Sequence, residues 1–311
     1  MKFIVIGEPC ADYIIKSDGT TYKSYGGILY SLITLSLLSN KNDIVFPVMM
    51  TGYDEYENIK NLLGRYENIN TDGIIKSELP MRQVKLDYTN IGGVKSERLE
   101  FSTQPVESLT YEQISPYIND ADAVLINLIS GVDITSDAFL ELRKNFKKNI
   151  HIDIHNLVLE TKPDGRRSYK NPDDWKLWCK NSDTLQMNEY EFLHISKEMK
   201  NEYMFAEEVL MSDDSSVKGI IITRGKAGLS GFTKKEKTFG TEKFTDIDKQ
   251  DIFAIENSHF IDSTGCGDVF AAAFTLDYNK TNNFIKSIHY ANRIASYKTS
   301  LQGIEELIKL K

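Results

Sequence analysis

The sequence predicts an α/β fold in which helices cover both faces of a mostly parallel central sheet, accompanied by a small separate β-sheet. Two observations lead to this prediction. Short apolar runs typical of buried strands alternate along the chain with stretches of helical spacing, and this order produces a parallel sheet with helices on both sides. Segments 9–25 and 81–103 interrupt the alternation, because they have the pattern of hairpins with one wet face. We expect these two segments to form the small sheet.

The first half of the chain supplies three expected strands of the central sheet, short apolar runs at 2–7, 44–50 and 123–128. Helices are expected after Gly26–Gly27, at 56–66, after the capping box that begins at Thr110, and at 135–147. In 81–103 the turn at Gly92–Gly93 predicts a hairpin. Its apolar face is expected to consist of Val84, Leu86, Tyr88, Leu99 and Phe101.

The second half continues the alternation. Strands are expected at 150–154, 184–187 and 220–223. Two more are expected, one near 229–238 and one near 252–256. The expected helices are a short one carrying Trp175 and Trp178, one that begins at Asn188, one that follows Asp268, and a last one at about 283–301. We assign the whole chain, 1–311, to one domain.

Composition and charge narrow the range of possible partners and cellular locations. The chain has 311 residues, a 41% hydrophobic fraction and a formal charge of -8 without a basic block, which argues against nucleic acid and membranes as partners. The three cysteines are far apart and form no C-x-x-C pair, as is typical of a reducing compartment. No apolar stretch is long enough to span a bilayer. We therefore expect a cytoplasmic protein.

The stretch 262–268, Asp-Ser-Thr-Gly-Cys-Gly-Asp, indicates chemistry on a phosphate. It leads into an apolar helix, whose first amides have no partners within the helix and suit an anion. A carboxylate at Asp268 could accept a proton from an attacking hydroxyl. This combination favours phosphoryl transfer to an alcohol. The alternative is that Asp268 only caps a core helix.

The same stretch resembles the D-T-x-G-A-G-D signature of the ribokinase-like carbohydrate kinases, the PfkB group, with Cys266 where that family usually has Ala. Further matches extend the resemblance from Gly7 to Gly303. It implies the ribokinase-like fold, with 9–25 and 81–103 as a lid over the active site. It also implies an ATP-dependent kinase that phosphorylates a small sugar or polyol. Asp268 would be the general base, and the amides of Gly265, Cys266 and Gly267 the anion hole.

The resemblance also implies cation sites. Asn188 and Glu191 match the family's N-x-x-E motif, which helps to organise Mg²⁺, mainly through water. The same spacing is a capping box, and both interpretations can hold together. Many family members use a monovalent cation beside the anion hole, so Asp262 and Thr264 are candidates for binding K⁺. Asp262 might instead only brace the loop.

Five residues are assigned to the nucleotide by the resemblance alone. Thr223, Gly225 and Gly228 match the family's T-x-G-x-x-G segment, while Asn292 and Gly303 match its adenine-side helix and loop. Without their place in the series of motifs, a G-x-x-G after a strand is usually a tight turn, and an Asn on a helix is ordinary surface.

At the other end of the chain, Asp12 resembles the family's substrate-binding Asp, and Gly26 and Gly27 resemble the glycine pair that closes on the substrate. A carboxylate can hold two sugar hydroxyls at once. The family commonly has Asn where Ser31 stands, and a ribose-type site would have Glu near 127–130, which this chain lacks. These departures leave the acceptor open between a sugar, a polyol and the ribose of a nucleoside.

Other interpretations remain open at this stage. The chain could be a nucleotide- or sugar-binding protein without catalysis, although Asp268 argues against that. A dinucleotide-binding dehydrogenase lacks support, because no G-x-G-x-x-G follows the first strand. Asp153 and His155 lie on one face of a strand, where a metal pair is conceivable but a polar strand end facing the substrate is favoured. Lids in this family often pair, which implies a homodimer.

Overall fold

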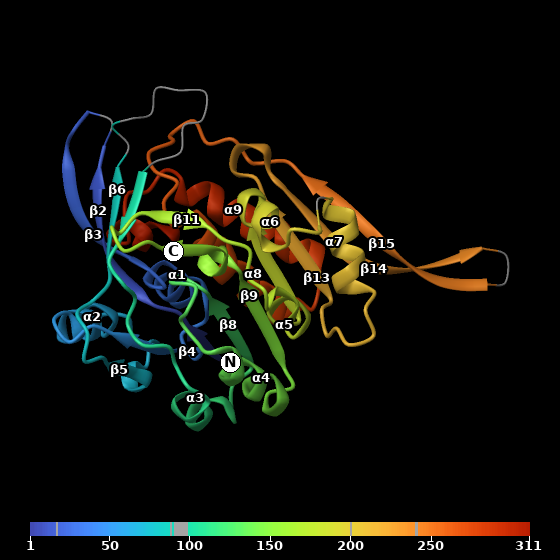
Figure 1. Cartoon of the computed structure of the whole chain (residues 1–311), viewed down its shortest axis with the longest axis horizontal. Coiled ribbons are helices and arrows are strands. Elements are labelled where there is room, and N and C mark those ends of the chain that lie inside the picture. Colours follow the sequence, from blue (N-terminus) through green and yellow to red (C-terminus); the bar gives the residue numbers. More distant parts are fainter. Residues whose placement is uncertain (17, 88, 90–98, 200, 240–241) are drawn as a thin grey trace.

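In the computed structural model, residues 1–16, 18–87, 89, 99–199, 201–239 and 242–311 are described. A nine-stranded sheet forms the centre, with the strand order β15-β14-β13-β12-β9-β8-β1-β4-β5 (Figure 1). The strands from β13 to β5 pair in parallel, and β14 and β15 extend the sheet antiparallel. The bounds are β1 Lys2–Ile6, β4 Ile44–Thr51, β5 Ile74–Lys76, β8 Ala123–Asn127, β9 Asn149–Asp153, β12 Thr184–Asn188, β13 Gly219–Thr223, β14 Leu229–Phe239 and β15 Glu242–Ile252.

Helices cover both faces of this sheet. One apolar cluster packs the β1 side chains Ile4 and Ile6 with α3 Tyr111–Ile118, α4 Ser136–Asn145, α5 Trp175–Lys180, α6 Glu189–Ile195 and α7 Glu202–Leu210. A second cluster packs Phe3 and Val5 with α1 Leu29–Leu38, α2 Tyr56–Leu63 and α8 Cys266–Thr281, and α9 Phe284–Lys298 packs on α8. Successive residues of a strand point to opposite faces, so β1 is apolar throughout. The predicted α/β class is confirmed.

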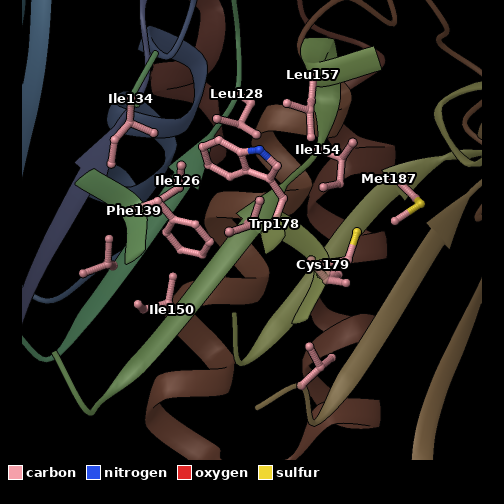
Figure 2. Packing of buried hydrophobic residues seen from close by; sticks show 14 of the residues in the cluster. Ile126, Leu128, Ile134, Phe139, Ile150, Ile154, Leu157, Trp178, Cys179 and Met187 are labelled. Carbon is pink, nitrogen blue, oxygen red and sulfur yellow. The ribbon is translucent and has the colours of Figure 1, made fainter. Parts of the chain in front are cut away.

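Trp178 anchors the first of these clusters. Its ring stacks on Phe139 of α4, with centroids 5.0 Å apart and an interplanar angle of 2°, and branched side chains from the strands surround the pair (Figure 2). Both aromatic side chains are buried. The short helix that carries the tryptophans therefore exists as predicted, and it is held by its apolar face rather than by its length.

The small sheet has four strands in the order β3-β2-β6-β7. The strands are β2 Pro9–Ile15, β3 Thr21–Gly27, β6 Gln83–Asp87 and β7 Leu99–Ser102. β2 pairs antiparallel with β3 and parallel with β6, so two segments far apart in sequence combine as predicted. A further hairpin, β10 Leu159–Thr161 with β11 Arg167–Tyr169, touches the end of β7, where Ser102 donates its amide to the Gly165 carbonyl at 2.8 Å.

The predicted apolar face of this sheet is wrong in part. Val84 and Leu86 are buried together on one face, but Phe101 pairs with Lys85 across the β6–β7 ladder and therefore lies on the other face. The cross-strand partner of Leu86 on the inner face is Glu100. Alternating apolar residues identify a face only when the pairing register is known. Tyr88 and the Leu99 side chain lie outside the described part.

Two other expectations need correction. The strand expected near 252–256 is β15, which ends at Ile252, because β14 pairs with it residue by residue as a long hairpin that projects from the body (Figure 1). Phe253, whose apolar character suggested a strand, is 87% exposed. Helix α7 was not expected from the sequence. Within the described residues, no helix is both long and apolar enough to cross a bilayer.

Candidate active site

A cleft of about 280 Å³ lies where the parallel strands end. Asn127, Asp153, Asn188 and Thr223 are the last residues of β8, β9, β12 and β13, four neighbouring strands. The cleft is bounded by this sheet edge, by the start of α8 and by the small sheet, which contributes Asp12, Val84 and Leu86. A ligand site outside the carboxyl ends of parallel strands is the general arrangement of open α/β sheets.

The 262–268 segment forms a tight turn at the start of α8. Gly265 has a φ of 77°, and a Cβ there would come within 2.5 Å of the Tyr30 ring, so both conformation and space require glycine. Gly265 and Gly267 line the cleft. The Cys266 amide instead donates to the Ser263 carbonyl at 3.1 Å. Of the three residues of the predicted anion hole, Gly265 and Gly267 therefore line the cleft, and the Cys266 amide is used within the turn.

Asp268 lies in the first turn of α8, and its side chain is buried at the cleft. Asn127 Nδ2 donates to Asp268 Oδ1 at 2.6 Å, and Ser31 Oγ donates to the Asp268 carbonyl at 3.0 Å. Burial raises the pKa of Asp268 to about 7, although the Asn127 hydrogen bond opposes this shift. A carboxyl group with this pKa can exchange a proton near neutral pH.

Asp153 is a second buried carboxyl group beside Asp268. Gln186 Nε2 donates to Asp153 Oδ2 at 3.0 Å and to the Gly267 carbonyl at 3.1 Å, which ties the end of β9 to the anion loop. Ligand atoms of Asp153, His155 and Asp268 lie within 4.8 Å of one another. Burial, together with the charges of Glu191 and Asp268, raises the pKa of Asp153 well above its usual range. Asp153 does face the cleft, as predicted.

Asn188 and Glu191 form the predicted capping box and also line the cleft. The Glu191 Oε2 atom accepts the Asn188 amide at 2.7 Å, Glu191 Oε1 accepts Asn188 Nδ2 at 2.6 Å, and Asn188 Oδ1 accepts the Glu191 amide at 2.9 Å. Burial raises the pKa of Glu191 to about 8. Both Glu191 oxygens are thus occupied by Asn188, which is compatible with an ion held through water.

Of the five predicted nucleotide residues, only Thr223 belongs to the described lining of this cleft. Thr223 lines it, whereas Gly225 and Gly228, with φ of 52° and 87°, form a turn in which the Arg224 amide donates to the Gly228 carbonyl at 2.7 Å. Asn292 on α9 donates its side-chain amide to the Phe253 carbonyl at 2.9 Å. Gly303, with a φ of 62°, lies in the loop after α9.

On the acceptor side, Asp12 is 4% exposed and lines the cleft with Gly27. Cys10 Sγ donates to Asp12 Oδ1 at 3.2 Å. The Asp12 carboxylate sits directly over Gly26, where a Cβ would come within 2.0 Å of Oδ2. The glycine pair is therefore needed to let β3 pass beneath this carboxylate.

Asp262 and Thr264 are linked to each other, because the Thr264 amide donates to Asp262 Oδ1 at 2.8 Å. A buried ammonium lies on the other side. Lys298 is fully buried, its Nζ is 3.6 Å from Asp262 Oδ2, and it donates to the Leu301 carbonyl at 3.1 Å. Asp262 thus braces the loop, and it does so next to a positive charge of the chain itself.

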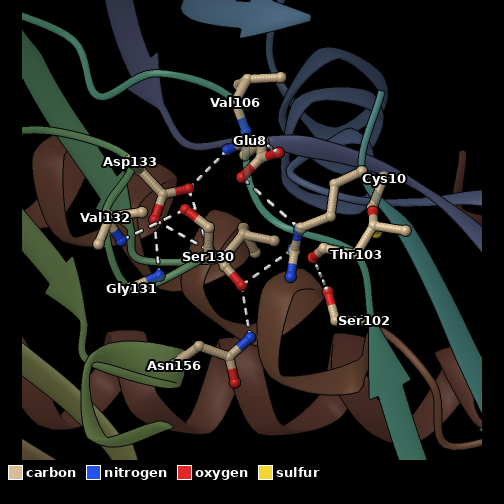
Figure 3. Close-up of polar contacts among 12 residues, drawn as sticks. Glu8, Cys10, Ser102, Thr103, Val106, Ser130, Gly131, Val132, Asp133 and Asn156 are labelled. Atoms are coloured by element: carbon tan, nitrogen blue, oxygen red, sulfur yellow. Dashed lines mark hydrogen bonds and ion pairs between the residues drawn. The ribbon is translucent and has the colours of Figure 1, made fainter. Parts of the chain in front are cut away.

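Several residues of the site were missed by the sequence reasoning. Asn127 and Gln186 are polar residues in otherwise apolar strands, and that signal was present in the sequence. Arg82 was not singled out either. It is buried against Glu8, which in turn donates its amide to Asp133 at 2.7 Å and accepts the Val106 amide at 3.2 Å (Figure 3). Arg167, on the unexpected β11, gave no sequence signal.

Comparisons with known proteins bear on the family and the fold of the chain. A family model described as pfkB family carbohydrate kinase matches residues 48–308. None of the curated proteins matches the chain. Among solved structures, the chain is similar to ribokinase from Thermotoga maritima, with a TM-score of 0.73 at 18% identity over 100% of this chain and 99% of that chain.

Two further solved structures are similar over nearly their whole length. One is a pyrophosphate-dependent kinase of the ribokinase family complexed with a pyrophosphate analog and myo-inositol, with a TM-score of 0.73 at 18% identity over 99% of this chain and 99% of that chain. The other is adenosine kinase from Schistosoma mansoni in complex with 2-fluoroadenosine, with a TM-score of 0.72 at 17% identity over 97% of this chain and 96% of that chain. At these identities the likeness establishes the fold.

Proposed function

The chain belongs to the pfkB family of carbohydrate kinases, and from this premise we propose that it transfers the terminal phosphoryl group of ATP to a hydroxyl of a small sugar or polyol. The observation that carries the proposal is Asp268, a buried carboxyl group at the first turn of α8, in a cleft it shares with Gly265, Gly267 and Asp12. A base, amide donors and a hydroxyl-binding carboxylate in one cleft suit phosphoryl transfer to an alcohol.

In the proposed reaction, the acceptor hydroxyl gives its proton to the Asp268 carboxylate while its oxygen bonds to the terminal phosphorus of the donor. The bond from that phosphorus to the bridging oxygen breaks, and ADP leaves with the bonding electron pair. The amides of Gly265 and Gly267 would donate to the phosphoryl oxygens. The hydrogen bond from Asn127 to Asp268 Oδ1 holds the carboxyl group in place and leaves Oδ2 for the proton.

ATP is proposed as the donor because an exposed apolar segment adjoins the predicted nucleotide residues Gly228 and Asn292. Thr223, Gly225 and Gly303 are proposed to belong to the same nucleotide site. Phe253, Ile255, Phe260 and Ile261 are all about half exposed or more. Ile255 and Phe253 are joined to α9 through hydrogen bonds from Ser296 and Asn292. A nucleotide base can bury such a surface, whereas a pyrophosphate donor has nothing apolar to place there.

Magnesium fits the acidic end of the cleft. Three buried carboxyl groups, those of Asp153, Glu191 and Asp268, supply oxygen ligands of the kind that Mg²⁺ prefers. We propose that Asn188 and Glu191 orient the ion through water and that Asp153 faces it. Bound magnesium would neutralise charge on the donor phosphates. A monovalent cation at Asp262 and Thr264 would have to share the Asp262 carboxylate with Lys298, and the dependence of turnover on K⁺ at constant ionic strength tests that site.

The small sheet is proposed to act as the lid. Asp12 would hold acceptor hydroxyls, and the Gly26–Gly27 backbone would lie against the bound molecule. Val84 and Leu86 from the same sheet cover the cleft with apolar side chains. Excluding water from the cleft would limit hydrolysis of the donor. We also propose that the outer face of this lid pairs in a homodimer.

The deciding experiment measures product formation with ATP or pyrophosphate, Mg²⁺, and a panel of sugars, polyols and nucleosides. We expect ADP and a phosphorylated sugar or polyol. A phosphorylated nucleoside would identify a nucleoside kinase of the same fold. Formation of product from pyrophosphate only would overturn the proposed donor, and binding of acceptors without any product would identify a catalytically silent binding protein.

A further inference from the structure

Two arginine side chains lie at the acceptor end of the cleft. Arg82 precedes β6, and Arg167 belongs to β11 of the β10–β11 hairpin. Their side chains are only 2% and 3% exposed, yet both line the cleft together with Val84, Leu86 and Glu100. Buried arginines are rare unless their charge has a partner. The hydrogen bonds and ion pairs within the chain therefore show which donors of the two guanidinium groups remain without an acceptor.

The contacts of Arg82 are made with Glu8 and with the backbone at Ile129. Its Nε lies 3.5 Å from Glu8 Oε2, and its Nη2 donates to the Ile129 carbonyl at 3.1 Å. Glu8 does not belong to the described lining of the cleft. Glu8 is held by hydrogen bonds with the Val106 amide and the Asp133 carboxylate (Figure 3). Arg82 is thus a positive charge set into the wall of the cleft and fixed by the fold.

Within the described part of the chain, Arg167 is bound on the Glu100 side only. Its Nη1 donates to Glu100 Oε1 at 3.2 Å, and its Nε is a buried donor with no hydrogen-bond partner among the described residues. Burial lowers the pKa of Arg167, the nearby charge of Arg82 lowers it further, and Glu100 opposes both effects. A buried N–H without an acceptor is unfavourable. A guanidinium that belongs to the wall of a cleft and has a donor without a partner is suited to a carboxylate or a phosphate group.

Building on the proposed function, we propose that the phosphate acceptor carries an anionic group, a carboxylate or a phosphate monoester, in addition to the hydroxyl that is phosphorylated. Arg167 binds this group, and Arg82 contributes its field from the wall of the cleft. Asp12 and Glu100 are acceptors only and take hydroxyl protons of the same molecule. The two arginines thereby select sugar acids or sugar phosphates over neutral sugars.

The test measures binding without a donor, so that it does not depend on catalysis. Titration calorimetry compares matched sets: glucitol, gluconate and glucitol 6-phosphate, and likewise ribitol, ribonate and ribitol 5-phosphate. We expect an anionic member to bind at least about 10-fold more tightly than its neutral alditol, since hydrogen bonds to charged groups are the stronger ones. The carboxylate and phosphate arms identify which anion the cleft takes.

Arg167→Met should remove this preference, with a loss of about 10- to 100-fold for the anionic compound and little change for the alditol. Arg167→Lys keeps the charge without the planar fork and should restore only part of it. Arg166→Met is the matched control, because Arg166 is the neighbouring residue but is 71% exposed and pairs with Asp164. Melting curves verify that each variant is folded.

Three outcomes would overturn the proposal: neutral alditols that bind as tightly as the anions, an anion preference that survives Arg167→Met, or no binding by any anionic member. These outcomes are separable from the proposed kinase activity. A protein that binds an anion through Arg167 but yields no product with any donor retains this site and loses the kinase function. A kinase that uses a neutral sugar better than its anionic counterparts, both before and after Arg167→Met, retains its function and loses this site.

Discussion

The position of Asp268 depends on contacts that reach it from three parts of the chain. Gly265 allows the turn before α8 because it tolerates a positive φ beside Tyr30. Ser31 of α1 holds the Asp268 backbone, and Asn127 of β8 holds its carboxyl group. The side chain is therefore fixed before any substrate binds, as catalysis by positioning requires.

We expect Asp268→Asn to fold and to lose roughly 10²–10⁴-fold in turnover, because an amide cannot accept the hydroxyl proton. In the unmutated protein the pKa of Asp268 is raised to about 7, so kcat/KM should fall about tenfold per pH unit below that value and level off above it. Initial rates across pH measure both effects. A variant within a few-fold of the unmutated protein would show that Asp268 is not the base.

The raised pKa of Asp268 also makes the stability of the folded protein depend on pH. The folded protein keeps the Asp268 proton up to about pH 7, whereas the unfolded chain loses it near the ordinary pKa of 3.8. The contribution of this group to stability is therefore complete below pH 3.8 and is lost as the pH rises through about 7. Asp268→Asn cannot ionise. Without Mg²⁺, its melting temperature relative to the unmutated protein should therefore be higher at pH 8 than at pH 5, and calorimetric melting tests this.

At the scale of elements, the capping box of α6 has two roles in one geometry. Asn188 and Glu191 satisfy the free amides at the start of the helix, and the same side chains line the cleft. Helix α3 begins with a second capping box, formed by Thr110 and Gln113, which lies outside the described lining of the cleft. Both helices therefore have a capping box, but only the capping box of α6 lies at the cleft.

We expect Asn188→Ala and Thr110→Ala each to cost about 0.5–2 kcal/mol of stability, because each removes a cap. Only the changes at α6, Asn188→Ala and Glu191→Gln, should also raise the Mg²⁺ concentration needed for half-maximal turnover. Chemical denaturation and magnesium titrations measure the two quantities. If the α6 variants keep the magnesium dependence of the Thr110→Ala control, the capping role is sufficient and the magnesium role is refuted.

At the scale of the whole molecule, the small sheet has two faces with different tasks. Its inner face covers the cleft with Val84 and Leu86, and its outer face carries Phe101 beside Lys85 and the 39% exposed Tyr13 beside Lys23. A four-stranded sheet with aromatic side chains outside gains stability by covering them. The pairing register thus assigns Leu86 to the acceptor and Tyr13 and Phe101 to the proposed dimer.

We expect the unmutated protein to have the mass of a dimer in light scattering and Tyr13→Asp to have that of a monomer, because a charge would be buried at the interface. Leu86→Glu serves as the counterpart on the inner face: it should weaken acceptor binding and leave the mass unchanged. A strictly monomeric unmutated protein, or a Tyr13→Asp variant that stays dimeric, would rule out pairing through this face.

The sequence by itself determined the α/β class, most of the central strands and the tight turn at 262–268. These features depend on residues close together in the chain: an apolar run such as 2–7, helical spacing, or a capping residue and its partner three positions on. Thr110 and Asn188 begin helices as predicted for that reason. The tight turn at Gly265 also follows from local backbone sterics.

Only the tertiary structure decided which distant side chains meet. Asn127 reaches Asp268 across 141 positions of sequence, and Gln186 reaches the Gly267 carbonyl across 81. Arg167 enters the cleft because the β10–β11 hairpin, which was not expected from the sequence, docks against β7. Phe101 lies on the face opposite to the predicted one because it pairs with Lys85. A difference of one residue in the pairing register places every side chain of a strand on the other face. Such contacts follow from packing and pairing between remote segments, for which no local pattern exists.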